Sequence, residues 1–326
     1  MDILFLTRKW PPAMGGMETW SVELVSELAR DHDMTLHKLP GRANGAPPGA
    51  LALLGFGLRT AISVLFDRRA YDVVAAGDLA MWPLVWLAGL FRKGTARGVA
   101  AHGTDASFAS RSGMVARLYA GYLRLGARLL PQVRIVANSD ATAGLVRALG
   151  YRQVAVVPLA TRAGHSPPPD PDNTLLLPGR ILPRKGLRWF VENVLPQLPE
   201  TLFLQVAGTI WDADEATALS HPRVHHLGQL DAEALARRMA TARAVILPNI
   251  PTGPGHFEGF GLVAVEAAAA GAVVLASRLD GFTTSVIEGE TGFLVAGIRP
   301  AEDATFRRAG DGDTDAARPF RDKDPD

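Results

Sequence analysis

Short runs of β-branched and apolar residues alternate with longer segments of helical periodicity, and this alternation constrains the fold more than any other feature of the chain. In the first half we expect strands at 3–7, 34–39, 72–76, 98–102, 134–137 and 154–157, with helices at 17–30, 51–66, 114–130 and 141–149. In the second half we expect strands at 174–178, 202–207, 224–227, 244–248 and 273–276, with helices at 187–198, 232–240 and 261–270. Such alternation is typical of parallel sheets covered by helices. The simplest architecture is α/β, with two Rossmann-like doubly wound domains facing each other across a cleft.

The stretch 165–171 separates the two sets of elements and contains four prolines. A segment this rich in proline is typical of a linker or a domain edge. We therefore expect a first domain at 1–165 and a second at 166–297. From 298 to 326 about half of the residues are charged and few are large and apolar, so we expect a disordered or atypical tail.

Composition and length exclude several classes of protein. The 326 residues suffice for two domains, and the net charge of +1 gives no reason to expect a nucleic acid partner. The chain has no cysteine, which excludes disulfides, thiolate metal sites and cysteine nucleophiles. The first residues lack a basic leader followed by a long apolar run, and the apolar stretch 79–91 is too short to cross a bilayer. We therefore expect a cytoplasmic protein whose membrane contact, if any, is peripheral.

Two motifs of the first domain follow predicted strands. Gly15 and Gly16 precede a helix, where a bare backbone and free N–H groups allow close approach to a phosphate, although a glycine pair is also typical of a plain tight turn. The three spaced glycines of a dinucleotide site are absent, which disfavours a dehydrogenase. His102 ends the fourth strand before Gly103, so we expect it to point into a cleft rather than a core. There it would bind a sugar hydroxyl or assist proton movement, or be a simple turn histidine.

The second domain opens with the basic loop 178–186, which contains Arg180 and Lys185 at a strand-to-helix transition. An arginine and a lysine at such a place can neutralise the charge that grows on a departing diphosphate. A solvated basic loop is the alternative.

The segment 256–267 carries the strongest signal. Gly259 and Gly261 open a helix whose first N–H groups could hold a phosphate. Glu258 lies at its mouth and Glu266 lies eight residues on, which at a helical rise of about 1.5 Å per residue is roughly 12 Å, comparable to the span from a donor sugar to its ribose. A carboxylate in the apolar run 262–270 is costly to bury without a partner. The alternative is two unrelated surface glutamates.

In this order, the segments resemble the family 4 retaining glycosyltransferases (glycosyltransferase group 1) of bacterial envelope and exopolysaccharide type, which have the GT-B fold. The resemblance runs from residue 3 to about residue 295. It also includes Ala137-Asn138-Ser139, Lys185-Gly186 and the segment 289–295.

The resemblance implies a role for each matching residue. Four are implied at the reacting centre: His102 beside the donor sugar, Glu258 on the hydroxyls of the transferred sugar, and Arg180 and Lys185 on the diphosphate charge. The residues implied to bind the donor are Gly15, Gly16, Arg180, Lys185, Glu258, Phe260, Gly261, Leu262 and Glu266, with Glu266 on the ribose hydroxyls. No cofactor and no metal ion is expected, because protein cations take the role of the metal at the leaving group.

The expected reaction moves a sugar, with retention of configuration, from a nucleotide diphosphate sugar to a hydroxyl of a glycan, lipid-linked or small-molecule acceptor. UDP is the favoured carrier and GDP the next. A nucleotide-sugar epimerase and a non-catalytic partner subunit stay as alternatives, whereas a phosphorylase would need a longer chain. The resemblance also implies helices after residue 295, and the polar tail in their place suggests a truncation, a shifted reading frame or a natural short variant.

A basic helix raises a further expectation. Between Asp105 and Asp140 there is no acidic residue, but there are arginines at 111, 117, 124, 128 and 134. Apolar and aromatic residues interleave with them at helical spacing, namely Leu118, Tyr119, Tyr122, Leu125 and Leu129. Such a helix is either an ordinary surface helix or one that lies on an anionic bilayer, which would place the protein on the inner face of the cell membrane.

Overall fold

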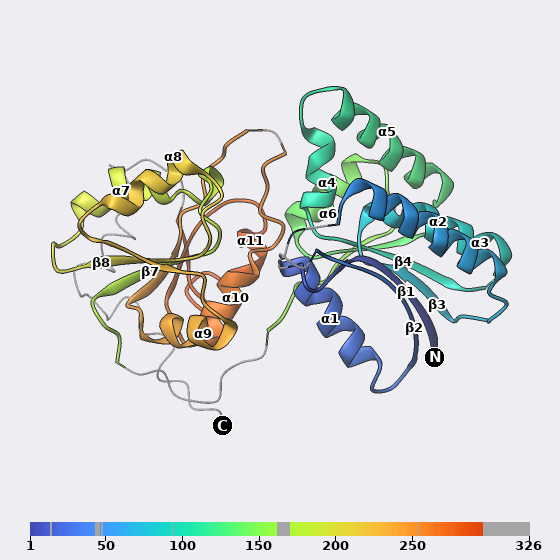
Figure 1. The fold of residues 1–326 in the computed structure, drawn as a ribbon, viewed down its shortest axis with the longest axis horizontal. Coiled ribbons are helices and arrows are strands. Elements are labelled where there is room, and N and C mark those ends of the chain that lie inside the picture. The colour runs from blue at the N-terminus through green and yellow to red at the C-terminus, as the bar shows by residue number, and fades with distance from the viewer. Residues whose placement is uncertain are drawn as a thin grey trace. The chain divides into compact units, whose positions relative to one another are not determined.

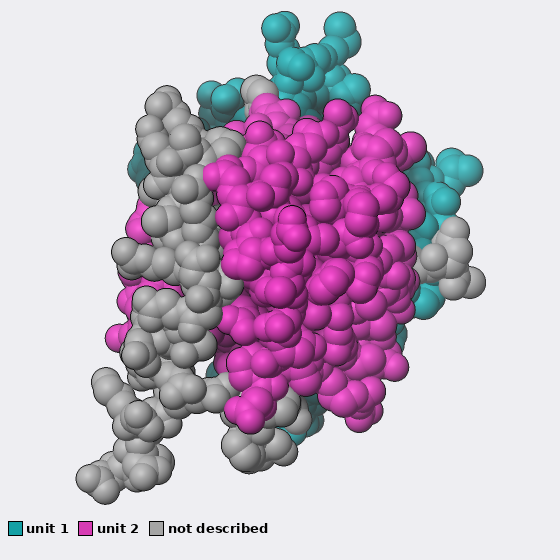
Figure 2. Space-filling model, turned by 90° about the vertical axis from the view of Figure 1, so that its left-hand side faces the viewer, with its two compact units in different colours: residues 1–158 teal, residues 159–326 magenta. Residues whose placement is uncertain are grey.

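The computed structural model describes residues 1–13, 15–42, 46, 48–92, 94–161, 170–253 and 255–295. The chain divides into two compact units, residues 1–158 and 159–326, which Figure 2 colours separately. The predicted boundary at 165/166 and the predicted tail at 298–326 both lie outside the described residues.

The first unit is built on a six-stranded parallel sheet in the order β2-β1-β3-β4-β5-β6. Its strands are β1 (Asp2–Trp10), β2 (Asp33–Pro40), β3 (Val73–Ala76), β4 (Ala96–Ala101), β5 (Arg134–Ala137) and β6 (Val154–Val156). Its helices are α1 (Gly16–Leu28), α2 (Ala50–Phe66), α3 (Trp82–Phe91), α4 (Thr104–Ser107), α5 (Met114–Leu129) and α6 (Asp140–Ala148). The chain moves one way from β1 to β2 and the other way afterwards, so right-handed crossovers put α1 on one side of the sheet and α2, α3 and α5 on the other (Figure 1).

The second unit repeats this plan with the strand order β12-β11-β10-β7-β8-β9. Its strands are β7 (Thr174–Pro178), β8 (Phe203–Ala207), β9 (Val224–Gly228), β10 (Ala244–Leu247), β11 (Val274–Ser277) and β12 (Phe293–Val295). Its helices are α7 (Leu187–Asn193), α8 (Ala213–Ala216), α9 (Ala232–Thr241), α10 (Leu262–Ala269) and α11 (Phe282–Ser285). Successive residues of β7 face opposite sides: Leu175 and Leu177 pack with Phe190 of α7, whereas Leu176 packs in the cluster that holds Ala264 of α10. Both faces are covered, which explains why this strand is continuously apolar.

The predicted α/β class and the doubly wound sheets are confirmed, and each predicted strand is present with small shifts at its ends. The helix expected at 187–198 is shorter, since α7 ends at Asn193 and a 3₁₀ turn (Leu195–Gln197) follows. Pro196 explains this end, because its ring has no N–H to donate and would clash with the carbonyl of Glu192. Helix α3 was not predicted, although Pro83 in its first turn is a favourable start. Among the described residues, no helix is both long enough and apolar enough to cross a membrane.

Candidate functional site

The loops that follow β7, β10 and β11 meet at one edge of the second sheet. These strands are neighbours and run parallel, so their carboxyl ends lie side by side. Two backbone hydrogen bonds tie the loops together: Ile250 N–H donates to the carbonyl of Arg184 at 3.0 Å, and Gly281 N–H donates to the carbonyl of Glu258 at 2.9 Å. The fold thus brings together residues that lie far apart in the sequence.

Gly186 allows the closest of these approaches. Its φ is +71°, in the left-handed region, and a Cβ at this position would lie 2.0 Å from the carbonyl oxygen of Pro248. Only glycine satisfies both conditions. It ends the short turn Pro183–Lys185 and begins α7, so it positions Lys185 against the loop after β10.

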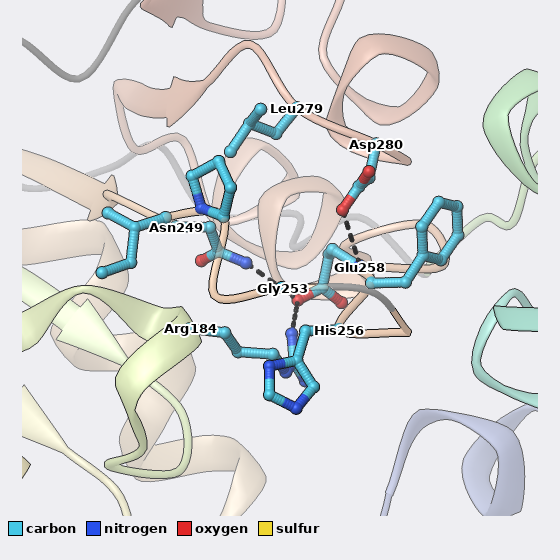
Figure 3. A pocket seen from close by; sticks show the side chains of 10 residues that line it. Arg184, Asn249, Gly253, His256, Glu258, Leu279 and Asp280 are labelled. Carbon is cyan, nitrogen blue, oxygen red and sulfur yellow. Dashed lines mark hydrogen bonds and ion pairs between the residues drawn. The ribbon is translucent and has the colours of Figure 1, made fainter. Parts of the chain in front are cut away.

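Three donors converge on one oxygen of Glu258. Its Oε2 accepts from Lys185 Nζ at 2.6 Å, from Arg184 Nη1 at 2.8 Å and from Asn249 Nδ2 at 3.2 Å. Figure 3 shows Arg184 and Asn249 approaching this carboxylate from different loops. The side chains of Lys185, Glu258 and Arg184 are only 11%, 17% and 18% exposed. Charged groups this far from water are held together by short, charge-assisted hydrogen bonds, and loss of one partner is costly.

This arrangement fixes the charge of Glu258. Burial raises the pKa of Glu258, but the charges and hydrogen bonds of Lys185 and Arg184 lower it more, to about 2. Burial lowers the pKa of Lys185, and Glu258 opposes that effect. Burial likewise raises the pKa of Asp280, whose Oδ2 accepts from Glu258 N–H at 3.1 Å. Glu258 is therefore an ionised carboxylate at any physiological pH.

A cavity of about 150 Å³ opens beside this cluster (Figure 3). Its lining includes Arg184, Asn249, Glu258 and Asp280, together with His256 and apolar residues of the same loops. Asn249 is buried, and its Oδ1 has no hydrogen-bond partner in the part of the chain that the structure describes. The cavity thus combines carboxylates, an unused amide oxygen and a guanidinium, which are groups that bind hydroxyls.

Helix α10 starts next to the cluster. Gly261 precedes it with φ +82°, and a Cβ there would lie 2.3 Å from the Phe282 ring, so this position also requires glycine. Among the described residues no acceptor binds the backbone N–H groups of Phe260, Gly261 and Leu262, as expected where the peptide turns into a helix. These groups are available for an anion, as the resemblance implies.

Glu266 lies inside α10 and is half-buried. Its carboxylate has no hydrogen bond or ion pair within the described residues, and burial raises its pKa. Because the helix begins only at Leu262, helical rise does not apply to the whole segment from Glu258 to Glu266, and the expected spacing of roughly 12 Å is not supported.

Arg180 is at the same edge but makes a different contact. Its guanidinium carbon lies 4.5 Å from the centre of the Trp211 ring, a cation–π arrangement. Its positive charge also contributes to the lowered pKa of Lys185. The two predicted cations therefore share one electrostatic environment, in which Lys185 binds Glu258.

In the first unit, His102 is buried, contrary to the expectation that it points into a cleft rather than a core. It is 6% exposed, and its ring packs edge-on against Trp20 at 4.6 Å. Its Nε2 lies 3.0 Å from the Gly77 carbonyl, which requires the proton on Nε2 and leaves Nδ1 for any exchange with a ligand. The buried Asp105 accepts from the N–H groups of His102 and Leu79 and so holds this turn together.

Gly15 and Gly16 lie at the start of α1. A Cβ at Gly16 would meet nothing within 4 Å, so the space beside this residue is open to a ligand. Gly15 lines a separate cavity of about 350 Å³ together with Glu18 and Glu23. Glu18 is paired beside this cavity, because its Oε1 lies 3.8 Å from Lys9 Nζ.

Three residues of the second-unit site were not singled out from the sequence, although Arg184 lies in the basic loop 178–186 whose cations were predicted to face a diphosphate. Arg184, Asn249 and Asp280 each follow a strand that ends at this edge. The available signal was their position, because polar residues directly after neighbouring parallel strands meet at one edge. Within the described residues there is no group of three or more His, Asp or Glu side chains arranged to hold a metal ion.

Comparison with known proteins shows what this arrangement resembles. Residues 172–311 match the family model for glycosyl transferases group 1. The D-inositol 3-phosphate glycosyltransferase 2 of Catenulispora acidiphila is 33% identical over 209 residues, which are 53% of this chain and 46% of that relative. The chain thus spans about half the length of this relative. The GDP-mannose-dependent alpha-(1-6)-phosphatidylinositol monomannoside mannosyltransferase of Mycolicibacterium smegmatis is 25% identical, with 90% of this chain and 85% of the relative aligned.

Solved structures share the architecture over nearly the whole chain. Anabaena HepE in complex with UDP superimposes with a TM-score of 0.67 at 18% identity, covering 98% of this chain and 96% of HepE. The catalytic domain of starch synthase IV from Arabidopsis thaliana, bound to ADP and acarbose, gives 0.68 at 13% identity, covering 98% and 92%. At such identities the likeness establishes the fold. These findings confirm the resemblance and the fold predicted from the sequence: residues 172–311 match the glycosyl transferases of group 1, in a chain with the GT-B fold.

Proposed function

We propose that this protein is a retaining, metal-independent glycosyltransferase that moves a sugar from a nucleoside diphosphate sugar to an acceptor hydroxyl. The observation that carries the proposal is the convergence of Arg184, Lys185 and Glu258 beside a polar cavity at the carboxyl edge of the second sheet. Ligands of doubly wound sheets bind at this edge.

The cations of this cluster suit a departing diphosphate. Lys185 uses one of its three N–H donors on Glu258, and Arg184 uses one of five, so both keep donors for phosphate oxygens. They stabilise negative charge most strongly because they lie in a poorly solvated site. Arg180 adds a third positive charge. Protein cations would thus replace a metal ion at the leaving group.

The carboxylates suit the hydroxyl groups of the donor. The partners of Glu258 keep it ionised and bind its Oε2. A sugar hydroxyl can donate to its other oxygen, Oε1. Glu266 has no protein partner among the described residues and would accept from the ribose hydroxyls. His102 would assist at the reacting centre through Nδ1. Gly16 would allow the diphosphate to approach the first unit.

The donor nucleotide and the acceptor are proposed only by chemical class. A UDP-sugar is our first choice and a GDP-sugar the second; the HepE complexes with UDP support the former and the name of the Mycolicibacterium relative supports the latter. The acceptor would be a glycan, lipid-linked or small-molecule hydroxyl of the cell envelope, since several relatives are named for inositol or phosphatidylinositol acceptors. The enzyme would act in the cytoplasm, at the inner face of the membrane where the acceptor is lipid-linked.

The test is nucleotide release from UDP- and GDP-sugars by the purified full chain, with inositol phosphate or lipid acceptors and with an excess of EDTA. The proposal expects acceptor-dependent release that EDTA does not reduce and that falls by about 10²–10³-fold in Lys185→Met. Glu192→Gln, at an exposed glutamate that pairs with Arg188, is the control and keeps full activity. Release that needs added metal would refute metal independence. Release without any acceptor would favour a hydrolase, and conversion of the donor into another nucleotide sugar would favour an epimerase. The anomeric configuration of the product, read by NMR, tests retention.

A further inference from the structure

The helices α2, α3 and α5 form one layer on the first sheet, opposite α1 (Figure 1). Helix α3 contacts both α2 and α5, so the layer is continuous. The side of each helix that faces away from the sheet therefore shares one outward direction. This outer face exposes many large apolar side chains.

Helix α2 turns a stripe of large apolar side chains outward. Phe56, Thr60 and Val64, four residues apart, are buried against the sheet. The exposed residues are Leu51, Leu54, Leu58, Ile62, Leu65 and Phe66, with Leu51 86% exposed. At about 100° per residue the first five fall within an arc of roughly 80°, opposite the buried arc. The stripe is about 22 Å long at a helical rise of about 1.5 Å per residue.

Helix α5 likewise exposes most of its large apolar side chains. Its buried side is made of Ala116, Ala120, Leu123 and Gly126, mostly small residues. Its exposed apolar residues are Met114, Val115, Leu118, Leu125 and Leu129, and the end of α3 adds Leu90 and Phe91. Tyr119 and Tyr122 do not belong to this face, contrary to the grouping by helical spacing, because their hydroxyls donate to the carbonyls of Asp105 and Ala80.

The charges of this face have one sign. None of the three helices contains an aspartate or a glutamate, although the chain has 33 acidic residues against 34 basic ones. Arg117, Arg124 and Arg128 are exposed on α5 and lie beside its apolar arc, and Arg59 lies beside the stripe of α2. A face that combines large exposed apolar side chains with arginines and no carboxylate matches an interface of acyl chains and anionic headgroups.

A second copy of the chain fits this face poorly. A two-fold dimer apposes the same patch from both subunits, so arginines would meet arginines with no carboxylate of the patch to pair with them. We therefore propose that the outer face of α2, α3 and α5 is a docking surface for an anionic lipid bilayer. On the bilayer, the leucines of α2 and α5 enter the interfacial region and the arginines bind lipid phosphates. Docking does not require the reaction proposed above.

The experiment is vesicle flotation of the full chain with two lipid compositions, phosphatidylcholine alone and phosphatidylcholine with about 30% phosphatidylglycerol. Each arginine that engages the anionic lipid should raise the affinity for the vesicle by about fivefold. We expect binding to the anionic vesicles that added salt weakens. Leu54→Ser and Leu58→Ser should each weaken it by about three- to tenfold, and Arg124→Gln by about fivefold. These side chains are exposed, so thermal unfolding should not change.

The matched control is Ile287→Ser, because Ile287 is an apolar residue of the second unit with 53% exposure, comparable to Leu58. It should bind as the wild type does. Glu258→Gln should also keep vesicle binding while losing sugar transfer, which separates this proposal from the proposed function. No binding to either vesicle, equal binding to both, or an equal loss in Ile287→Ser and Leu58→Ser would overturn the proposal.

Discussion

Glu258→Gln is the substitution that tests the site most sharply, because it keeps the shape of the side chain and removes only its charge. In the folded protein the partners of Glu258 hold its pKa at about 2, against an ordinary value of 4.5. A carboxyl whose pKa is lower by this amount in the folded state than in the unfolded state contributes about 3 kcal/mol to the free energy of unfolding at neutral pH. The variant also leaves Lys185 and Arg184 buried without a counter-charge, which supports a loss of this size.

The pH dependence of this loss has a defined sign. Because the pKa of Glu258 is lower in the folded state, its contribution is fully present above the unfolded pKa of 4.5 and is lost as the pH falls through about 2. The difference between wild type and Glu258→Gln should therefore be about 3 kcal/mol at about pH 7 and about 1.5 kcal/mol at about pH 3. Groups whose pKa does not depend on the charge of Glu258 cancel from this difference.

The assay is urea unfolding monitored by hydrogen–deuterium exchange. Peptides from β7 and β10 report the stability of the second unit alone. Glu266→Gln is the matched control. Burial raises the pKa of Glu266, so its charge opposes folding at neutral pH and its removal should stabilise the unit. A difference for Glu258→Gln below about 0.5 kcal/mol, or one that does not shrink on acidification, would refute the assignment of a charged cluster.

Three further substitutions probe neighbouring features. Gly261→Ala should destabilise the second unit by about 2 kcal/mol or more, since its Cβ would lie 2.3 Å from the Phe282 ring at φ +82°; a melting temperature equal to wild type would contradict this. Trp211→Leu removes the ring beside Arg180, a contact worth about 0.5–1 kcal/mol, so calorimetry should give less than about a fivefold change in nucleotide affinity. Arg180→Ala should weaken nucleotide binding by tenfold or more, because hydrogen bonds to charged groups are worth about 1.5–3 kcal/mol, and unchanged affinity would remove Arg180 from the site.

The layout of strands was predictable because each buried strand is a short apolar run bounded by glycine, proline or polar residues. The strands at 134–137 and 174–178 were predicted to the residue. Periodicity does not, however, say which arc of a helix faces the core. In α5 the inner arc is lined by alanine and glycine, so the sequence pattern grouped Tyr119 with the exposed Leu118, although the tyrosine points inward.

The site was predictable in part. Glu258 and Lys185 were identified from their motifs, and the structure joins them at 2.6 Å although they are 73 residues apart. Asn249 and Asp280 were not identified, because each is a single polar residue after a strand and gains its role only from the order of strands in the sheet. The burial of His102 depends on Trp20, a contact between segments that local patterns do not reveal.

The central claim is that the edge of the second sheet binds a nucleoside diphosphate. The most direct measurement is calorimetric titration of the full chain with UDP, GDP and ADP, repeated for Glu266→Ala. We expect selective binding of one diphosphate, UDP in the first instance, and a loss of at least tenfold in the variant because the ribose hydroxyls lose their acceptor. No binding of any of the three by the folded wild type, or equal affinity in wild type and variant, would contradict the assignment.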